Sequence, residues 1–270
     1  MLIGISGRIG SGKDTIGKII QYLVWKSRVE RGELPLSVYS FSDFARETSF
    51  GKNQSGFEIK KYADKLKDFV CILIGCTREQ LEDQDFKNKE LGEEWNCYIF
   101  NNGKKEELTL NYNIAKTLSA DNRIISRILT PRLLLQVIGT ECIRDKVHPN
   151  AWVNALFADY KYEIHRSEVP TRAAGFIDQH VYPNWIITDM RFPNELEAVK
   201  SRGGITIRVN RPYTTVVGGN GIPATFSQNQ FHPSETSLDS ATFDFVISND
   251  KDIEHLINEV RKILEKLNII

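Results

Sequence analysis

Hydrophobic positions near the start of the chain switch from a strand-like to a helix-like pattern. Residues 2–6 form a short β-prone run, and a glycine-rich turn separates that run from apolar residues at helical spacing. These apolar residues are Ile16, Ile19, Ile20, Leu23 and Val24. A second β-prone run, residues 37–41, follows a region with Gly and Pro. The pattern predicts a βαβ unit with a parallel, buried sheet.

The last third of the chain repeats this alternation. Residues 185–189 form an apolar strand that ends in an acid, and residues 194–201 have helical spacing. Residues 204–209 and 243–248 are β-prone, and residues 253–267 form an amphipathic helix. Strands that alternate with helices at both ends of the chain predict an open α/β sheet.

The middle of the chain is less regular. Helices are expected at residues 59–74, from Pro131 onward, and at residues 151–160. Asn102-Gly103, between two β-prone runs, predicts a hairpin over 96–111. Polar residues, glycine and prolines interrupt any period over 165–184, so a surface loop or small excursion of about 20 residues is expected there. We therefore expect a core formed by about 1–49 and 184–270, with a largely helical insertion at about 50–183.

Composition limits the partners. The 270 residues carry 35 Lys+Arg and 35 Asp+Glu, and this neutral balance argues against binding to long nucleic-acid polymers. No apolar run approaches the ~20 residues of a membrane helix, and no secretory signal is apparent, so we expect no membrane and a cytoplasmic protein, in the host cytoplasm if viral. The four cysteines have neither disulfide nor zinc spacing, which indicates reduced thiols.

The glycine-rich turn satisfies G-x-x-x-x-G-K, and it lies between a predicted strand and a predicted helix. Its residues are Gly7, Arg8, Ile9, Gly10, Ser11, Gly12 and Lys13. Glycines allow successive backbone N–H groups to converge on phosphate oxygens, and the helix N-terminus adds a positive dipole end. Lys13 can reach the β- and γ-phosphates. The turn therefore predicts a nucleotide triphosphate site.

Magnesium ligands are expected close to this turn. Asp14 follows Lys13, where a hydroxyl is usual, and Thr15 comes next, so either residue could take the metal-ligating role. Asp14 could instead orient the loop without touching metal. Asp189 ends an apolar strand, where it could align the ion, and Arg191 lies two residues on at the carboxyl edge of the sheet.

Competing phosphate-loop proteins fit less well. A guanine-specific GTPase needs N-K-x-D, and residues 88–91 read NKEL. A helicase or transporter ATPase would be larger, and no basic stripe for a nucleic-acid track is present. A small-molecule kinase fits better, and it needs basic side chains that screen several phosphates. The candidates in the insertion are Lys65, Lys67, Arg123, Arg127, Arg132 and Arg144.

Five blocks of the sequence together resemble the phage-type deoxynucleoside monophosphate kinases. They are GRIGSGKDT, YADKLKDFVCILIGCTREQLEDQDFK, TPRLLLQVIGTECIRDKVHPNAWV, WIITDMRFPNELEAVKSRGGITIRV, and HPSETSLD with FDFVISND. The blocks cover well over half of the chain, and those that begin at Thr130 and Trp185 are the most specific.

This resemblance implies a P-loop NTPase-type three-layer sandwich with a parallel sheet and a nucleoside monophosphate kinase-like insertion. It implies transfer of the ATP γ-phosphoryl group to a deoxynucleoside 5′-monophosphate with Mg²⁺. Residues 7–15 would hold ATP, with Asp189, Arg191 and Arg132 beside the transferring group. The monophosphate would be bound by Lys65, Lys67, Arg132, Gln136, Gly139, Thr140, Arg144 and Trp152. A homodimer is also plausible on this resemblance.

Two alternatives stay open from the sequence. Phosphomevalonate kinases share the GKD loop and an S-E-x-x-L-D string, although the PRLLLQVIGTE block and Trp152 look more like the deoxynucleotide enzymes. A catalytically silent nucleotide-binding subunit would retain the loop for assembly, but intact Lys13, Asp189 and Arg191 argue against it. Gly218–Gly221, ahead of His232, indicates a loop that closes over the nucleotide.

Overall fold

A computed structural model describes residues 1–35, 40–46, 54–95, 98–101, 104–107, 129–168, 176–212 and 233–270. The chain divides into two compact units. The first comprises residues 1–62 and 153–270, and the second comprises residues 63–152. Each unit has its own buried apolar cluster, so each is described by itself.

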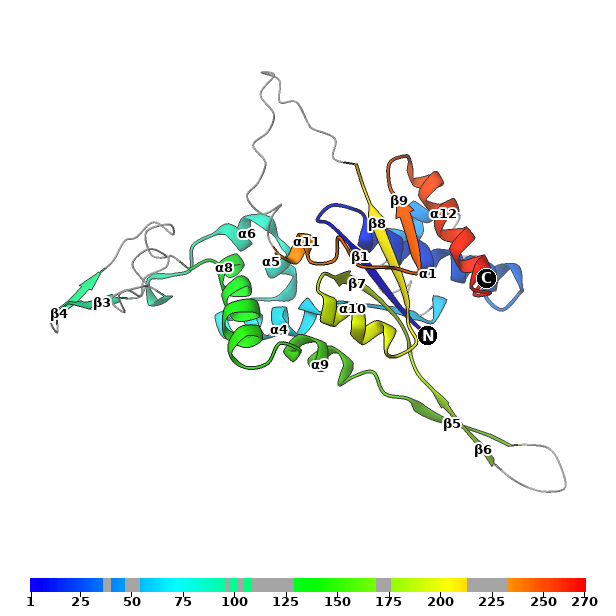
Figure 1. Ribbon diagram of the computed structural model, residues 1–270, viewed down its shortest axis with the longest axis horizontal. Coiled ribbons are helices and arrows are strands. Elements are labelled where there is room, and N and C mark those ends of the chain that lie inside the picture. The colour runs from blue at the N-terminus through cyan, green and yellow to red at the C-terminus, as the bar shows by residue number, and fades with distance from the viewer. Residues whose placement is uncertain are drawn as a thin grey trace, which may run out of the picture. The chain divides into compact units, whose positions relative to one another are not determined.

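The first unit is built on a five-stranded sheet in which every neighbouring pair is parallel (Figure 1). Its strands in spatial order are β2 (Phe57–Lys60), β7 (Asn184–Met190), β1 (Leu2–Gly7), β8 (Ile205–Asn210) and β9 (Phe245–Ser248). The central strand, β1, therefore has neighbours on both sides. Its two neighbours, β7 and β8, come from sequence segments far from β1. Parallel strands alternating with helices confirm the expected α/β class.

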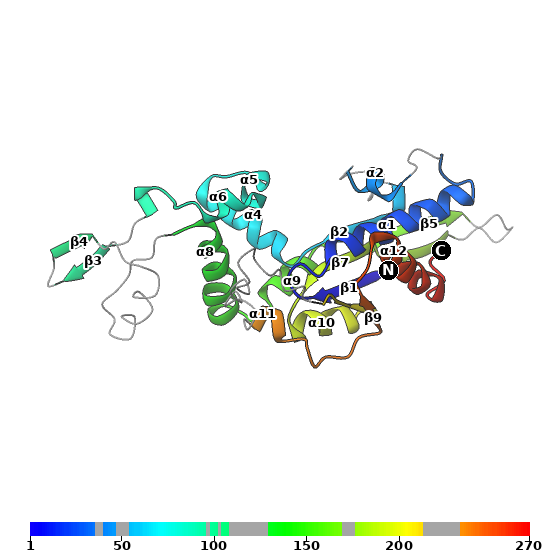
Figure 2. The same ribbon diagram turned by 90° about the horizontal axis from the view of Figure 1, so that it is seen from above.

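Helices cover both faces of this sheet. One face packs against α1 (Lys13–Glu30) and α12 (Ile253–Lys266), and α2 (Phe41–Arg46) packs beside α1. The other face packs against α9 (Ala151–Phe157) and α10 (Pro193–Lys200). Figure 2 shows α1 and α10 on opposite sides of β1. The short α11 (Pro233–Thr236) precedes β9 in the chain.

The central strand explains why the unit has three layers. All six residues of β1 are buried, and their side chains alternate between the two faces. Ile3 and Ile5 join the cluster under α1 and α12, whereas Leu2 joins the cluster under α10. A Cβ on Gly4 would lie 3.1 Å from Val199 Cγ2, so the glycine allows α10 to approach closely. A strand covered on both faces reads as a continuous apolar run, as residues 2–6 do.

Some sequence-based expectations were met only in part. The segment 165–184, expected to be a surface loop or small excursion, contains most of β5 (Glu163–Glu168) and all of β6 (Phe176–Val181), which pair in antiparallel register and lead into β7. The expected helix over 59–74 begins only at Ala63, because residues 57–60 form β2 and bond to β7. The expected strand over 37–41 lies largely outside the described residues, and Phe41 already belongs to α2.

The described residues of the second unit are mainly helical. Its helices are α4 (Ala63–Ile74), α5 (Arg78–Glu82), α6 (Gln84–Asn88), the 3₁₀ turn η1 (Glu93–Trp95) and α8 (Pro131–Gln136), continued by the π-helical segment η3 (Val137–Arg144). A hairpin of β3 (Tyr98–Asn101) and β4 (Lys104–Glu107) confirms the expected antiparallel pair. The buried centre consists of Val70, Cys71, Leu81 and Leu134. β2 and the β5–β6 pair belong to the first unit, and the insertion expected over 50–183 stays a prediction.

Two further observations concern the whole described chain. Within the described ranges, no helix is long and apolar enough to cross a membrane.

Three cysteines, Cys71, Cys76 and Cys142, are free thiols, and burial raises the pKa of Cys71 to about 11. A thiol with so high a pKa is a poor nucleophile at neutral pH, so Cys71 acts as a small buried side chain of the second unit.

Candidate phosphate-binding site

The glycine-rich turn joins the end of β1 to the start of α1. Gly10 and Gly12 have positive φ angles of 72° and 99°, which side chains with a Cβ rarely adopt. Gly12 is the N-cap of α1, with no side chain that caps the first turn. Asn249 donates from Nδ2 to the carbonyl of Ser11 at 2.8 Å, and it holds the turn beside the end of β9. The first N–H groups of α1 and the turn therefore form an anion-binding arrangement.

Lys13 folds back over this turn. Its Nζ donates to the carbonyl oxygens of Gly7 and Arg8, both at 2.8 Å. Burial lowers the pKa of Lys13 to about 8, and the positive charge of Arg191 acts in the same direction. The carboxylates of Glu235, Asp14 and Asp189 oppose this shift. These charges all act on one ammonium group, so the structure brings four residues together: Lys13, Asp14, Asp189 and Arg191. All four were candidate site residues in the sequence analysis.

Asp14 is held by two partners from different elements. Thr188, on β7, donates its hydroxyl to Asp14 Oδ1 at 2.5 Å, and Lys61 Nζ lies 3.0 Å from Oδ2. Burial would raise the pKa of Asp14, but the Thr188 hydrogen bond and the Lys61 charge keep it below its ordinary value. The extra carboxylate of the GKD turn is thus ionised and partly neutralised by a lysine that follows β2.

Asp189 lies at an irregularity between β1 and β7. The pairing Gly4 with Ile187 is followed by Ser6 with Met190, so β7 contains one extra residue there. Such a bulge can turn a side chain toward a site at the end of a strand. Asp189 Oδ1 accepts a hydrogen bond of 2.8 Å from the backbone N–H of Tyr62. The bulge therefore allows two successive residues, Thr188 and Asp189, to contribute to the same site.

Arg191 is fixed by two glutamates. Glu195, which is 2% exposed at the start of α10, accepts from the backbone N–H groups of Arg191 and Phe192 at 2.7 and 3.1 Å. Glu235, on α11, pairs with the Arg191 guanidinium through Oε1. Its Oε2 accepts from the backbone N–H of Ile9 at 2.6 Å. Backbone and side chain of Arg191 are therefore both oriented by carboxylates.

Asp14 and Asp189 are the carboxylates of this site that could contribute to holding a metal ion. Mg²⁺ keeps several waters and is commonly held by one or two carboxylates together with substrate phosphates. Asp14 and Asp189 both act electrostatically on Lys13 and come from adjacent parts of the site. Within the described residues, no group of three or more His, Cys, Asp or Glu side chains is arranged to hold a metal ion. The donor set suits a cation that arrives with a nucleotide.

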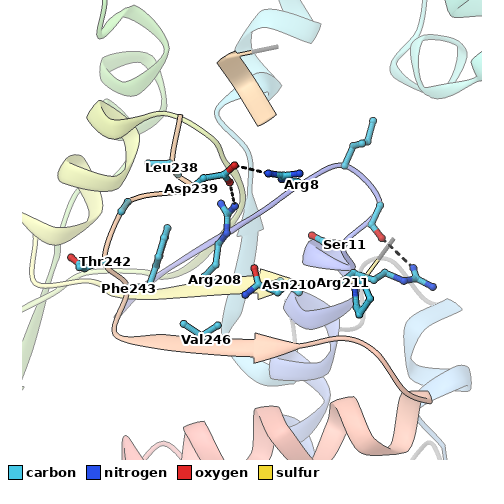
Figure 3. A pocket seen from close by; sticks show the side chains of 15 residues that line it. Arg8, Ser11, Arg208, Asn210, Arg211, Leu238, Asp239, Thr242, Phe243 and Val246 are labelled. Atoms are coloured by element: carbon cyan, nitrogen blue, oxygen red, sulfur yellow. Dashed lines mark hydrogen bonds and ion pairs between the residues drawn. The ribbon is translucent and has the colours of Figure 1, made fainter. Parts of the chain in front are cut away.

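A cavity of about 750 Å³ lies beside the turn, between the ends of β8 and the segment that follows α11 (Figure 3). Asp239 joins Arg8 at 2.6 Å and Arg208 at 2.5 Å, and Arg211 donates to the Gly10 carbonyl at 3.1 Å. Phe243 adds an apolar part to the lining. The volume lies in the range of small-molecule pockets.

Three candidate residues of the second unit, Lys67, Arg132 and Trp152, have partners within that unit. Arg132 donates from Nε to Asn88 and from a terminal nitrogen to Gln84, each at 2.7 Å. Lys67 pairs with Glu82 at 2.6 Å, and the Trp152 indole donates to the Gly139 carbonyl at 2.8 Å. The others lie on α4, α8 and η3: Lys65, Gln136, Gly139, Thr140 and Arg144.

Eight residues that contact the site in the structure were not among the candidate site residues chosen from the sequence. They belong to the first unit and are Lys61, Tyr62, Thr188, Glu195, Glu235, Asn249, Arg208 and Asp239. All of them except Lys61 lie inside the sequence blocks that carry the family resemblance, and Glu235 and Asp239 belong to the S-E-x-x-L-D string, but sequence reasoning assigned none of them a role in this site. Arg123, Arg127, Gly218–Gly221 and His232 lie outside the described residues.

Fold and site define an α/β protein with a glycine-rich strand-to-helix turn and with an acid and an arginine at the same sheet edge. A family model for deoxynucleotide monophosphate kinase matches residues 77–260. The chain therefore belongs to the deoxynucleotide monophosphate kinase family, a family of phosphotransferases, as the resemblance of its sequence blocks predicted.

Three viral relatives support this assignment. The chain is 25% identical over 262 residues to the deoxynucleoside-5′-monophosphate kinase of Escherichia phage T5. The matched region covers 88% of this chain and 85% of that protein. It is 25% identical over 136 residues to the deoxynucleotide monophosphate kinase of Enterobacteria phage T4, covering 50% and 46%. A provisionally assigned kinase of the same kind from Acanthamoeba polyphaga mimivirus is 27% identical over 132 residues, covering 48% and 59%. The chain thus spans about half the length of two of these relatives.

Proposed function

We propose that this chain transfers the γ-phosphoryl group of ATP to the 5′-phosphate of a deoxynucleoside monophosphate, giving the diphosphate and ADP. The observation that supports it most directly is the joint position of Lys13, Asp14, Asp189 and Arg191 around the turn between β1 and α1. Family membership supports the acceptor class. The order β2-β7-β1-β8-β9, with helices on both faces, supports a P-loop NTPase fold of the nucleoside monophosphate kinase type.

The turn and its lysine would bind the phosphates of ATP. Backbone N–H groups of Gly10 and Gly12 and of the start of α1 would provide donors, and Lys13 would provide charge once it leaves the Gly7 and Arg8 carbonyls. The cavity beside Arg8 offers room for a nucleotide-sized ligand. Bound Mg²⁺ would neutralise phosphate charge, and Asp14, Thr15 and Asp189 are the residues we propose to hold it directly or through water.

An acceptor that is already a phosphate needs little general-base assistance. Its oxygen is a nucleophile without loss of a proton, so catalysis depends on alignment and on screening of negative charge. Arg191 would stabilise charge on the transferring group. We assign acceptor binding to the second unit, where Arg132 and the other basic and polar candidates lie, and we treat a homodimer as a prediction that gel filtration can check.

The decisive experiment is ADP release in a coupled assay with ATP and Mg²⁺. Acceptors are dAMP, dGMP, dCMP, dTMP, 5-hydroxymethyl-dCMP, the matching ribonucleotides and phosphomevalonate. Turnover on at least one deoxynucleotide, lost in Lys13→Ala protein purified in parallel, is expected. Turnover on phosphomevalonate alone would replace the acceptor assignment, and no turnover on any acceptor would leave a silent nucleotide-binding protein as the better hypothesis.

A further inference from the structure

Glu235 connects three parts of the first unit that lie far apart in the sequence. One carboxylate oxygen accepts from the Ile9 N–H in the glycine-rich turn, and the other pairs with Arg191 just beyond β7. The carboxylate itself sits on α11. Its side chain is only 8% exposed, whereas that of Arg191 is 31% exposed. The carboxylate is therefore the more fixed member of the pair.

From this geometry we infer that Glu235 is the positioning residue for Arg191 in the proposed phosphoryl transfer. The inference rests on the proposed function. An arginine side chain has several rotatable bonds, and a carboxylate that binds one of its terminal nitrogens limits the positions of the guanidinium. Because the same carboxylate binds Ile9, it sets the position of the guanidinium relative to the turn that would hold the γ-phosphate.

The charges around the site separate this role from direct nucleotide binding. Lys13 and Arg191 are close enough for the arginine to lower the pKa of the lysine, and Glu235 counteracts that effect. Glu235 itself is an anion, so it repels phosphate and contributes no attraction for ATP. Its removal leaves both cations in place, so ATP should bind as tightly as before or more tightly. The transfer step should nevertheless slow, because the guanidinium loses its fixed position.

A second carboxylate on the same segment gives a comparison. Asp239 lies four residues after Glu235 and pairs with Arg8 and Arg208, not with Arg191. It therefore helps to attach the segment to the turn without orienting the arginine. If Glu235 acted only by attaching this segment, loss of either carboxylate would have the same consequence.

The test measures kcat and KM for ATP and for the best deoxynucleotide in Glu235→Ala, Glu235→Gln and Glu235→Asp protein. Glu235→Ala is expected to lower kcat by about 10- to 100-fold, as small misplacements of a catalytic group do, with KM for ATP unchanged or lower. Glu235→Gln should retain one of the two contacts and lose less. Glu259→Gln, which removes a carboxylate paired with Lys262 on α12, is the matched control and should keep wild-type kinetics.

A double-mutant cycle with Arg191→Ala decides whether Glu235 acts through the arginine. In the Arg191→Ala background, adding Glu235→Ala should change kcat by less than about twofold, because the group to be positioned is gone. Additive losses would overturn the inference. So would equal losses in Glu235→Gln and Asp239→Asn protein, or a rise in the ATP KM that accounts for the whole loss of kcat/KM.

Failure of the proposed function is recognised separately. If wild-type protein turns over no acceptor, the kinase assignment fails and the kinetic test does not apply. In that case the Arg191 side-chain Nε–H signal, observed by ¹H–¹⁵N NMR and assigned with Arg191→Lys protein, still tests the positioning. Glu235→Gln should shift or broaden this signal, whereas Glu259→Gln should not. An unchanged signal in Glu235→Gln protein would overturn the inference without reference to activity.

Discussion

The two units hold their candidate side chains in different ways. In the first unit, hydrogen bonds join residues that are very distant in sequence: Thr188 and Asp14 are 174 positions apart, and Ile9 and Glu235 are 226 apart. In the second unit, Arg132 binds residues 44 and 48 positions away, and Trp152 binds Gly139 only 13 positions away. The candidate site of the first unit is assembled at the ends of parallel strands. The candidate side chains of the second unit are held by neighbouring helices.

This difference teaches where rigidity is needed. Parallel strands in the middle of a sheet are buried on both faces, and their carboxyl ends meet at one edge, so side chains there have little freedom. Groups that stabilise a transition state benefit most from such fixed positions. The π-helical segment η3 in the second unit is an unusual element, of a kind often found at functional sites. We therefore expect the first unit to control kcat and the second to control acceptor binding.

The largest effect is expected from Lys13→Ala. Loss of the ammonium that would bridge the β- and γ-phosphates should lower kcat/KM for ATP by about a thousandfold or more. Coupled ADP release measures the rate, and circular dichroism checks the fold. Lys262→Ala, on the exposed face of α12, is the control and should be as active as wild type. A Lys13→Ala protein with normal turnover would remove the glycine-rich turn from the mechanism.

The next largest effects should distinguish the units. Arg191→Ala should lower kcat by about 100-fold with little change in ATP affinity, because it acts on charge in the transition state. Arg132→Ala should mainly raise KM for the monophosphate, by about 10- to 100-fold, because it removes charge-assisted contacts with the acceptor. Steady-state kinetics with each substrate varied in turn separates these outcomes. If Arg191→Ala affects only ATP binding, the contrast between the units is wrong.

The lowered pKa of Lys13 predicts a smaller effect, on stability. The unfolded chain binds a proton at Lys13 up to its ordinary pKa of 10.5, and the folded protein releases it near pH 8. Burial of this ammonium therefore costs stability below pH 8, and the cost disappears as the pH rises toward 10.5. Lys13→Met should be more stable than wild type at pH 7 by about 1–3 kcal/mol, with the difference shrinking at pH 10. Urea unfolding at both pH values measures it, and a constant difference would contradict the assigned burial.

The smallest effects come from helix caps in the two units. Thr130 caps α8 by accepting from the Leu133 N–H at 3.1 Å, and Asp252 caps α12 by accepting from the His255 N–H at 2.8 Å. Each change to alanine should cost about 1 kcal/mol. Hydrogen exchange should show Thr130→Ala loosening α8 and sparing α12, and Asp252→Ala doing the reverse. If both variants loosen both helices equally, the division into two separately packed units fails.

The neutral overall charge conceals an uneven arrangement. Sequence reasoning expected Lys13, Lys65, Arg132, Arg144 and Arg191 to face one anionic ligand pair. Lys13 and Arg191 do act on each other electrostatically in the first unit. The other three belong to the second unit, and their convergence on the same ligand stays a prediction. Near Lys13, acids partly compensate the cations, so the site is mixed in charge rather than simply basic.

The sequence alone determined the features that depend on neighbouring residues. Glycines at the positions with positive φ, a strand before them and a helix after them define the turn through local backbone chemistry. The apolar run that precedes Asp189 predicted a strand, and it therefore predicted that Asp189 and Arg191 lie at the carboxyl edge of the sheet. Short-range patterns also predicted the β3–β4 hairpin and α12.

Only the tertiary structure decided which residues meet. The partners of Asp14 depend on the position of β2 and β7 relative to α1 and on the extra residue in β7, and no local pattern encodes that pairing. Glu235 reaches Arg191 because the chain returns to the turn after β8. Strand order brings together residues that are up to hundreds of positions apart in the sequence. It is fixed by the packing of the apolar clusters on both faces of the sheet, which favours one arrangement of the strands. The sequence thus determined the chemistry of the glycine-rich turn, and the fold determined the residues that orient it.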